Sequence, residues 1–144
     1  MKGKLAVMLA VVIVFLATSA SVFAHHGNVA YDMKDLVALK NATVTKFFWA
    51  NPHNILTFDI KDDNGNVVHW VGETGSPAAV GPFGWTRDVV HPGEVVTVYI
   101  FRAKAGTPVG IINKIVLADG REFKDVPLGG TDAEREEAKR KGIE

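Results

Sequence analysis

The chain has 144 residues, with 16 basic and 16 acidic side chains and no cysteine. This neutral balance argues against nucleic acid as a partner, because its phosphates attract strongly basic surfaces. Without cysteine the chain can form no disulfide, no thiolate metal site and no covalently attached c-type haem, and it has no cysteine nucleophile. Any metal would therefore be bound by histidine, carboxylate or backbone groups.

Residues 1–24 have the pattern of a secretory signal peptide. Two lysines open the segment, residues 5–16 form an uncharged apolar run, and Val22-Phe23-Ala24 provides the small residues that a signal peptidase reads. We therefore expect cleavage before His25 and a periplasmic or secreted mature protein. The alternative is an uncleaved anchor, because about 20 uncharged residues can just span a bilayer as a helix. Only this segment would then contact the membrane.

Residues 25–130 are predicted to form one all-β domain of ordinary size. The lead at 25–35 shows no periodicity, so we expect an arm there. Runs of β-branched and aromatic residues, bounded by turn residues, predict five strands and a short edge segment. The strands are expected at residues 36–49, 55–61, 67–72, 94–102 and 111–117, and the edge segment around Phe123.

Asn64-Gly65 predicts a two-residue hairpin turn between the second and third strands, because both turn positions need a positive φ. That turn fixes the pairing of the two strands. It places Leu56 opposite Glu73 and Ile60 opposite His69. The same counting brings Glu73 to the end of the barrel at which the second strand begins.

Ser76 followed by Pro77 predicts a short helical turn at residues 76–80. Three strands, a short helix and two more strands are the order of an OB-like five-stranded Greek-key barrel, which is the fold we expect. The competing architecture is a small β-sandwich, but that fold has roughly seven strands. Residues 131–144 are charged on every face and are expected to form a solvated tail.

Cleavage at the predicted site would make His25 the first residue, followed directly by His26. An N-terminal histidine offers its α-amino nitrogen and a ring nitrogen to one metal, and a further imidazole would complete a nitrogen site that suits copper. This arrangement resembles the histidine brace. The further imidazole can come from His26, His53, His69 or His91, and the sequence does not choose between them. The alternative is that two histidines simply give the mature chain a polar start.

A second group of candidate residues is predicted at the end of the barrel where the short helix begins. These residues are Trp49, Asn51, His53, Glu73, Trp85 and Arg87. A histidine near a carboxylate can bind a metal or move a proton, and aromatic rings beside them can hold a sugar or another ring-shaped ligand. The structural alternative is that the two tryptophans close the barrel end while His53 satisfies backbone groups and Glu73 is solvated.

Several short motifs follow one another along the chain. They are His25-His26, Trp49-x-Asn51-Pro52-His53, Trp70-x-x-Glu73, Gly75-Ser76-Pro77, Gly84-Trp85-Thr86-Arg87-Asp88, Pro92-Gly93-Glu94 and Leu117-Ala118-Asp119-Gly120. In these motifs the chain resembles domain of unknown function 6152, a family of small exported bacterial proteins with no assigned function. The resemblance runs from residue 25 to residue 123. It implies export, mostly in Gram-negative bacteria, and a single β-rich domain, and it implies no activity.

The sequence favours a non-enzymatic periplasmic module that binds a small ligand or a metal ion, with copper at the N-terminal histidine as the sharper hypothesis. One alternative is a metal-dependent redox enzyme, which would use the same chelate with an open coordination position. Another is a structural or accessory subunit of an envelope complex, whose partner would be a second protein.

Overall fold

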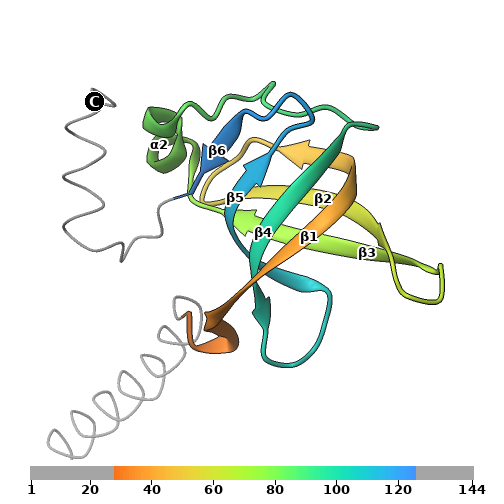
Figure 1. The fold of residues 1–144 in the computed structure, drawn as a ribbon. Helices are drawn as coiled ribbons and strands as arrows, with labels where there is room; N and C mark the ends of the chain where they lie inside the picture. The colour runs from red at the N-terminus through yellow and green to blue at the C-terminus, as the bar shows by residue number, and fades with distance from the viewer. Residues whose placement is uncertain (1–27, 126–144) are drawn as a thin grey trace, which may run out of the picture.

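Six strands and three short helical turns make up residues 28–125, the part of the chain that the computed structural model describes (Figure 1). The strands are β1 (Tyr31–Phe48), β2 (Asn54–Lys61), β3 (Val67–Thr74), β4 (Val95–Ala103), β5 (Val109–Val116) and β6 (Glu122–Lys124). The helical turns are η2 (Asn28–Ala30), α2 (Pro77–Val80) and η3 (Gly81–Phe83). The predicted signal peptide, the predicted mature start and the charged tail lie outside the described residues.

The sheet order is β3-β2-β1-β4-β5-β6, and an additional pairing of β3 with β5 closes the first five strands into a barrel. The β3–β5 pair is parallel, whereas the neighbouring strands in the sheet order pair antiparallel. The predicted five-stranded barrel with a short helix between its third and fourth strands is thus confirmed. In Figure 1 the β2–β3 hairpin projects on the side away from α2 and β6.

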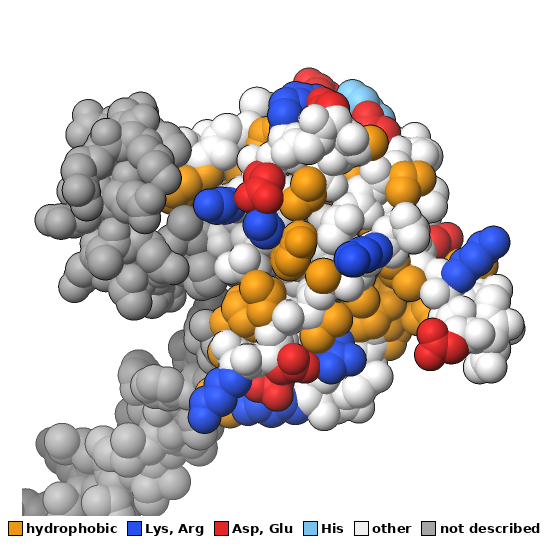
Figure 2. Space-filling model, viewed as in Figure 1, with side chains coloured by type: hydrophobic (Ala, Val, Ile, Leu, Met, Phe, Trp, Pro, Cys, Tyr) orange, Lys and Arg blue, Asp and Glu red, His pale blue; other side chains and the backbone are white. Residues whose placement is uncertain are grey.

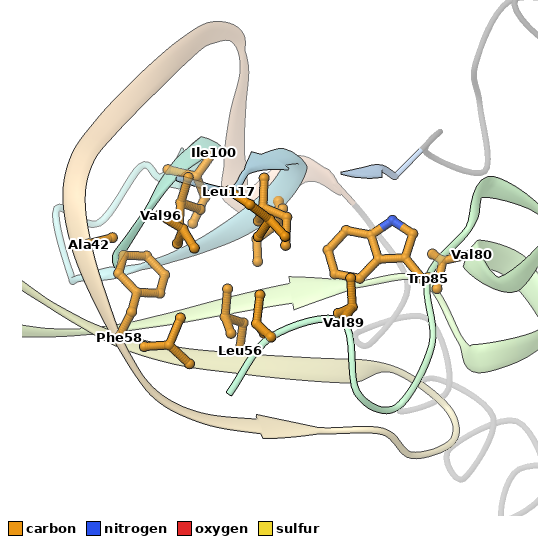
Figure 3. Close-up of a cluster of buried hydrophobic side chains, with 14 residues drawn as sticks. Ala42, Leu56, Phe58, Val80, Trp85, Val89, Val96, Ile100 and Leu117 are labelled. Atoms are coloured by element: carbon orange, nitrogen blue, oxygen red, sulfur yellow. The ribbon is translucent and has the colours of Figure 1, made fainter. Parts of the chain in front are cut away.

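Alternating side chains along the strands fill the barrel, as the period of two in the sequence predicts. Leu56 and Phe58 of β2 are fully buried and face the core side chains of β4, among them Ile100 (Figure 3). Trp85 occupies one end of this core beside Val80 (Figure 3). The loop after η3 therefore supplies the side chain that closes this end of the barrel core.

The prediction that residues 25–35 form an arm is wrong for the part that the structure describes. β1 begins at Tyr31, which pairs with Ala103 of β4. The N–H of Lys104 also donates to the carbonyl of Ala30 at 2.9 Å. Pairing with a strand that lies far along the chain extends β1, and no local periodicity in the sequence signals such a contact.

The turn between β2 and β3 is one residue longer than predicted. The N–H of Asp62 donates to the carbonyl of Asn66 at 2.9 Å, which leaves residues 63–65 as the loop. Gly65 has a φ of 81°, a conformation that glycine adopts readily. The Asp62 carboxylate accepts hydrogen bonds from Asn66 and from the N–H of Asn64. These bonds, led by that of the Asn66 side chain, hold the pKa of Asp62 below its usual value.

The longer turn shifts the strand register by one residue. Glu73 pairs with Ile55, not with Leu56. His69 pairs with Asp59, not with Ile60, and its side chain is 81% exposed. Because successive side chains alternate between the two faces of a strand, the shift moves His69 from the predicted inner face to the outer one.

Two glycines face each other where β3 closes on β5. Gly72 pairs with Gly110, and a β-carbon on Gly110 would lie 2.4 Å from the carbonyl oxygen of Phe101. A β-carbon on Gly72 would lie 2.5 Å from Cδ1 of Ile112. The barrel can close this tightly only because neither position has a side chain.

The viewed surface in Figure 2 carries hydrophobic side chains between basic and acidic ones, which are mixed rather than gathered by sign. None of the helical segments within residues 28–125 is long and apolar enough to cross a membrane.

Candidate functional site

His53 and Glu73 lie together at the end of the barrel that carries α2. Nδ1 of His53 is 3.1 Å from Oε1 of Glu73 and 3.1 Å from the carbonyl oxygen of Thr74. The next residue, Asn54, opens β2 and pairs with Thr74 near the end of β3. The sequence-based placement of His53 and Glu73 at one end of the barrel is therefore confirmed, although the register that led to it was one residue off.

The surroundings of His53 determine which ring nitrogen carries the proton. Both neighbours of Nδ1, the carboxylate of Glu73 and the carbonyl of Thr74, can only accept a hydrogen bond. Nδ1 is therefore the donor, and Nε2 of the neutral ring keeps a lone pair. The His53 side chain is 38% exposed. A histidine that donates from one nitrogen to a carboxylate or carbonyl is oriented to bind a metal, or to accept a proton, with the other.

A buried polar network fixes the backbone behind this pair. Asn54 is fully buried, and its Nδ2 donates to the carbonyl of Gly75 at 2.7 Å and to Oγ1 of Thr74 at 3.1 Å. Its Oδ1 accepts a hydrogen bond from the N–H of Ala50. The side chain thus connects the loop before β2 to the end of β3, which holds the Thr74 carbonyl in place against His53.

Asp125 is a member of this end of the barrel that sequence reasoning missed. Its side chain is buried and accepts a 2.7 Å hydrogen bond from the N–H of Gly75. Burial raises the pKa of Asp125 to about 6, although the Gly75 hydrogen bond and the nearby His53 act in the opposite direction. The charge of Glu73 raises this pKa further. The one sequence signal was an acidic residue directly after the edge strand.

Tyr31, the first residue of β1, also lies near Glu73. Burial raises the pKa of Tyr31, and the negative charge of Glu73 raises it further. A charge acts on a tyrosine in this way only over a short distance.

The two predicted tryptophans differ in burial. Trp85 is 2% exposed, with its ring 5.9 Å from that of Phe47 and 6.0 Å from that of Phe123. Its Nε1 donates to the carbonyl of Lys124 at 2.9 Å. Trp49 is half-buried and lies 6.0 Å from the ring of Phe47. Both rings therefore help to close the barrel end, as the structural alternative supposed.

The remaining predicted residues are spread over the surface of the domain. Asn51 and Arg87 are exposed, in the loop before β2 and in the loop after η3. His91 lines a separate groove of about 320 Å³, whose lining includes neither His53 nor Glu73. His69 is 2.7 Å from Asp59, far along β3 from Glu73. Of the described candidates, the structure thus brings only His53 and Glu73 into contact with each other.

The described residues do not by themselves form a metal centre. Within residues 28–125, histidine and carboxylate side chains nowhere gather in a group of three or more that could hold a metal ion. A metal at His53 would need further ligands from elsewhere in the chain. His25 and His26, which the sequence proposed, lie outside the described residues.

Comparison with known proteins gives one family. The model of a family of unknown function (DUF6152) matches residues 12–113. The matched range includes the loop before β2 and all of β3, and so both His53 and Glu73. No curated protein matches the chain.

Proposed function

Because the chain belongs to DUF6152, a family of unknown function, we propose from its own residues that it is an exported periplasmic module that binds a divalent metal ion. Copper is the ion that fits best. The ligands would be the α-amino and ring nitrogens of His25 and the ring of His53, with His26 as a further nitrogen donor. All of these are nitrogen ligands, and copper has the highest affinity for such sites among the common divalent metals.

The orientation of His53 carries this proposal. Its Nδ1 donates to Glu73 and Thr74, so Nε2 offers a lone pair at a side chain that is 38% exposed. Metal-bound histidines almost always have this second contact to a carboxylate or carbonyl. The buried Asn54 fixes the backbone at Thr74. The His53 ring is therefore oriented before a metal binds.

The length of the chain before β1 supports the involvement of His25. Tyr31 follows His25 by six positions along the chain, and an extended chain of that length reaches about 20 Å. Tyr31 lies close enough to Glu73 for the carboxylate to raise the tyrosine pKa. If His25 is the first residue, an extended chain from Tyr31 is long enough for its amine to approach Glu73.

The test uses protein exported with its own leader, whose first residue is identified by mass spectrometry. Copper(II) affinity is measured by competition for three forms: the mature protein, the same chain with one extra N-terminal methionine, and His53→Ala. We expect the extension and His53→Ala each to weaken binding by tenfold or more. His69→Ala is the control, because His69 is exposed on β3 at a distance from His53, and it should bind as the wild type does. Equal affinity of all four forms would refute the proposal.

The same preparation separates the two alternative functions. If the copper-loaded protein consumes oxygen when a reductant is added, and His53→Ala does not, the module is a redox enzyme rather than a carrier. A protein that binds no copper and purifies with a stoichiometric envelope protein is an accessory subunit instead.

A further inference from the structure

A groove of about 500 Å³ lies at the hairpin end of β2 and β3, at the far ends of these strands from Asn54 and Thr74. Strands β1, β2, β3 and β4 all contribute to its lining. The lining residues are Lys40, Asn41, Thr43, Asp59, Ile60, Lys61, Val67 and Val95. Its volume lies within the roughly 300–1,000 Å³ typical of small-molecule sites.

An irregularity in β1 shapes one wall of the groove. Leu39 pairs with Val98 and Ala42 pairs with Val96, so two residues of β1, Lys40 and Asn41, stand opposite a single residue of β4. Asn41 has a φ of 56°, within the left-handed region. Such a bulge bends the strand and redirects side chains, and bulges of this kind recur beside binding sites.

The groove combines an apolar surface with positive charge. Val67 is 51% exposed and Val95 is 49% exposed, so both valines offer apolar surface to the groove. Lys40 and Lys61, two basic residues, belong to the same lining. Asp59 is the acidic residue of the lining. Its carboxylate accepts a hydrogen bond of 2.7 Å from Nδ1 of His69, which is not itself a lining residue.

We propose that this groove binds a small organic anion. Its carboxylate or sulfonate group lies between the amines of Lys40 and Lys61, and its aromatic or branched apolar body covers Ile60, Val67 and Val95. A charged amine holds an anionic oxygen more strongly than a neutral donor does. Burying the two open valines under the apolar body adds hydrophobic stabilisation. The site shares no residue with the His53–Glu73 pair, so it is independent of the proposed metal.

Two fluorescent probes that differ mainly in one sulfonate test this inference. Anilinonaphthalene sulfonate carries the anion and phenylnaphthylamine lacks it, while both share the same ring system. We expect the sulfonate to bind the folded protein more tightly than the neutral probe. The double variant Lys40→Gln/Lys61→Gln should lose about tenfold in affinity for the sulfonate and show no change for the neutral probe.

A matched control uses two lysines outside the groove. Lys46→Gln/Lys104→Gln makes the same change of charge and should bind both probes as the wild type does. Backbone amide shifts on addition of the sulfonate should map to residues 40–43, 59–61, 67 and 95. Equal affinity of the two double variants for the sulfonate would overturn the proposal. Shifts concentrated in residues 84–94, which contribute to the groove lined by His91, would also overturn it. Circular dichroism of each variant verifies that the barrel is folded.

Discussion

Asp125 accepts a hydrogen bond of 2.7 Å from the backbone N–H of Gly75, and this contact joins the residue after β6 to the segment between β3 and α2. The carbonyl of the same Gly75 accepts a hydrogen bond from the buried amide of Asn54. The peptide after Thr74 is thus held from both sides. Since the Thr74 carbonyl contacts His53, the position of the histidine depends on Asp125 as well as on its direct partners.

The buried carboxyl of Asp125 should make stability depend on pH. Its pKa is about 6 in the folded chain against 3.8 for an ordinary aspartate, with burial as the largest cause. Between these two values the folded state binds the proton more tightly than the unfolded state does. The free energy of unfolding should therefore fall as the pH rises from about 4 to about 6, by roughly 2–3 kcal/mol from this group.

Urea unfolding of the wild type and Asp125→Asn between pH 4 and 7 measures this contribution. The amide oxygen can still accept from Gly75 but does not titrate, so the stability of Asp125→Asn relative to the wild type should increase with pH. Asp88→Asn, an exposed residue of the loop after η3, serves as the control and should follow the wild type. A constant difference between Asp125→Asn and the wild type would show that Asp125 titrates normally.

Asn54→Ala should destabilise the barrel by about 2–3 kcal/mol, because it removes a fully buried side chain and leaves polar partners without a hydrogen bond. The midpoint of chemical unfolding reports the loss. Asn66→Ala is the matched change at an exposed turn, where it removes a 3.1 Å contact with Asp62, and should cost less than about 1 kcal/mol. Similar losses for both variants would contradict the structural role assigned to Asn54.

Gly110→Ala should cost about 3 kcal/mol, because the new β-carbon meets the Phe101 carbonyl and the buried Ile100 side chain. Gly81→Ala is the control, since a β-carbon there would meet nothing within 4 Å and its φ of −52° suits alanine. Thermal unfolding should show a large loss for the first variant and little change for the second. If both melt like the wild type, the packing of Gly110 in β5 against β4 is looser than these distances indicate.

Glu73→Ala should weaken copper binding by about tenfold, because it removes the carboxylate that helps to fix the tautomer of His53. Glu73→Gln keeps an oxygen acceptor and should lose less. Glu94→Ala changes the same residue type outside the site and should leave copper affinity unchanged. If the affinity of Glu73→Ala equals that of the wild type, Glu73 has no part in orienting the ligand.

The strand pattern predicted the barrel because alternation along a strand indicates which side chains are buried. Ser76-Pro77 predicted α2 because helix capping depends on neighbouring residues alone. In the structure Ser76 accepts a hydrogen bond from the N–H of Ala79. The length of the hairpin turn was not predictable in this way. Asp62-Asp63-Asn64-Gly65 is compatible with a loop of two or three residues, and the hydrogen bonds of Asp62 favour the longer one. A difference of one residue was enough to reverse the expected face of His69.

The candidate site was only partly predictable for a different reason. His53 directly precedes β2 and Glu73 lies near the end of β3, so their proximity follows from one hairpin. Asp125 reaches the same place from 50 positions along the chain beyond Gly75, through the pairing of β6 with β5. No periodic pattern in the sequence indicates a contact between residues so far apart. Its burial, and with it the pKa shift, arises only when the barrel is assembled.

The closure of the barrel has a dynamic consequence. In the described residues the parallel register of β3 with β5 comprises three pairs, Val71–Val109, Gly72–Gly110 and Glu73–Ile111. This seam joins parts of the chain that are distant in sequence, and it is much shorter than the eight-pair ladder of β2 with β3. Local unfolding that separates the seam would displace Glu73 at the same time. Amide exchange along the seam would therefore also report how often His53 loses its carboxylate partner.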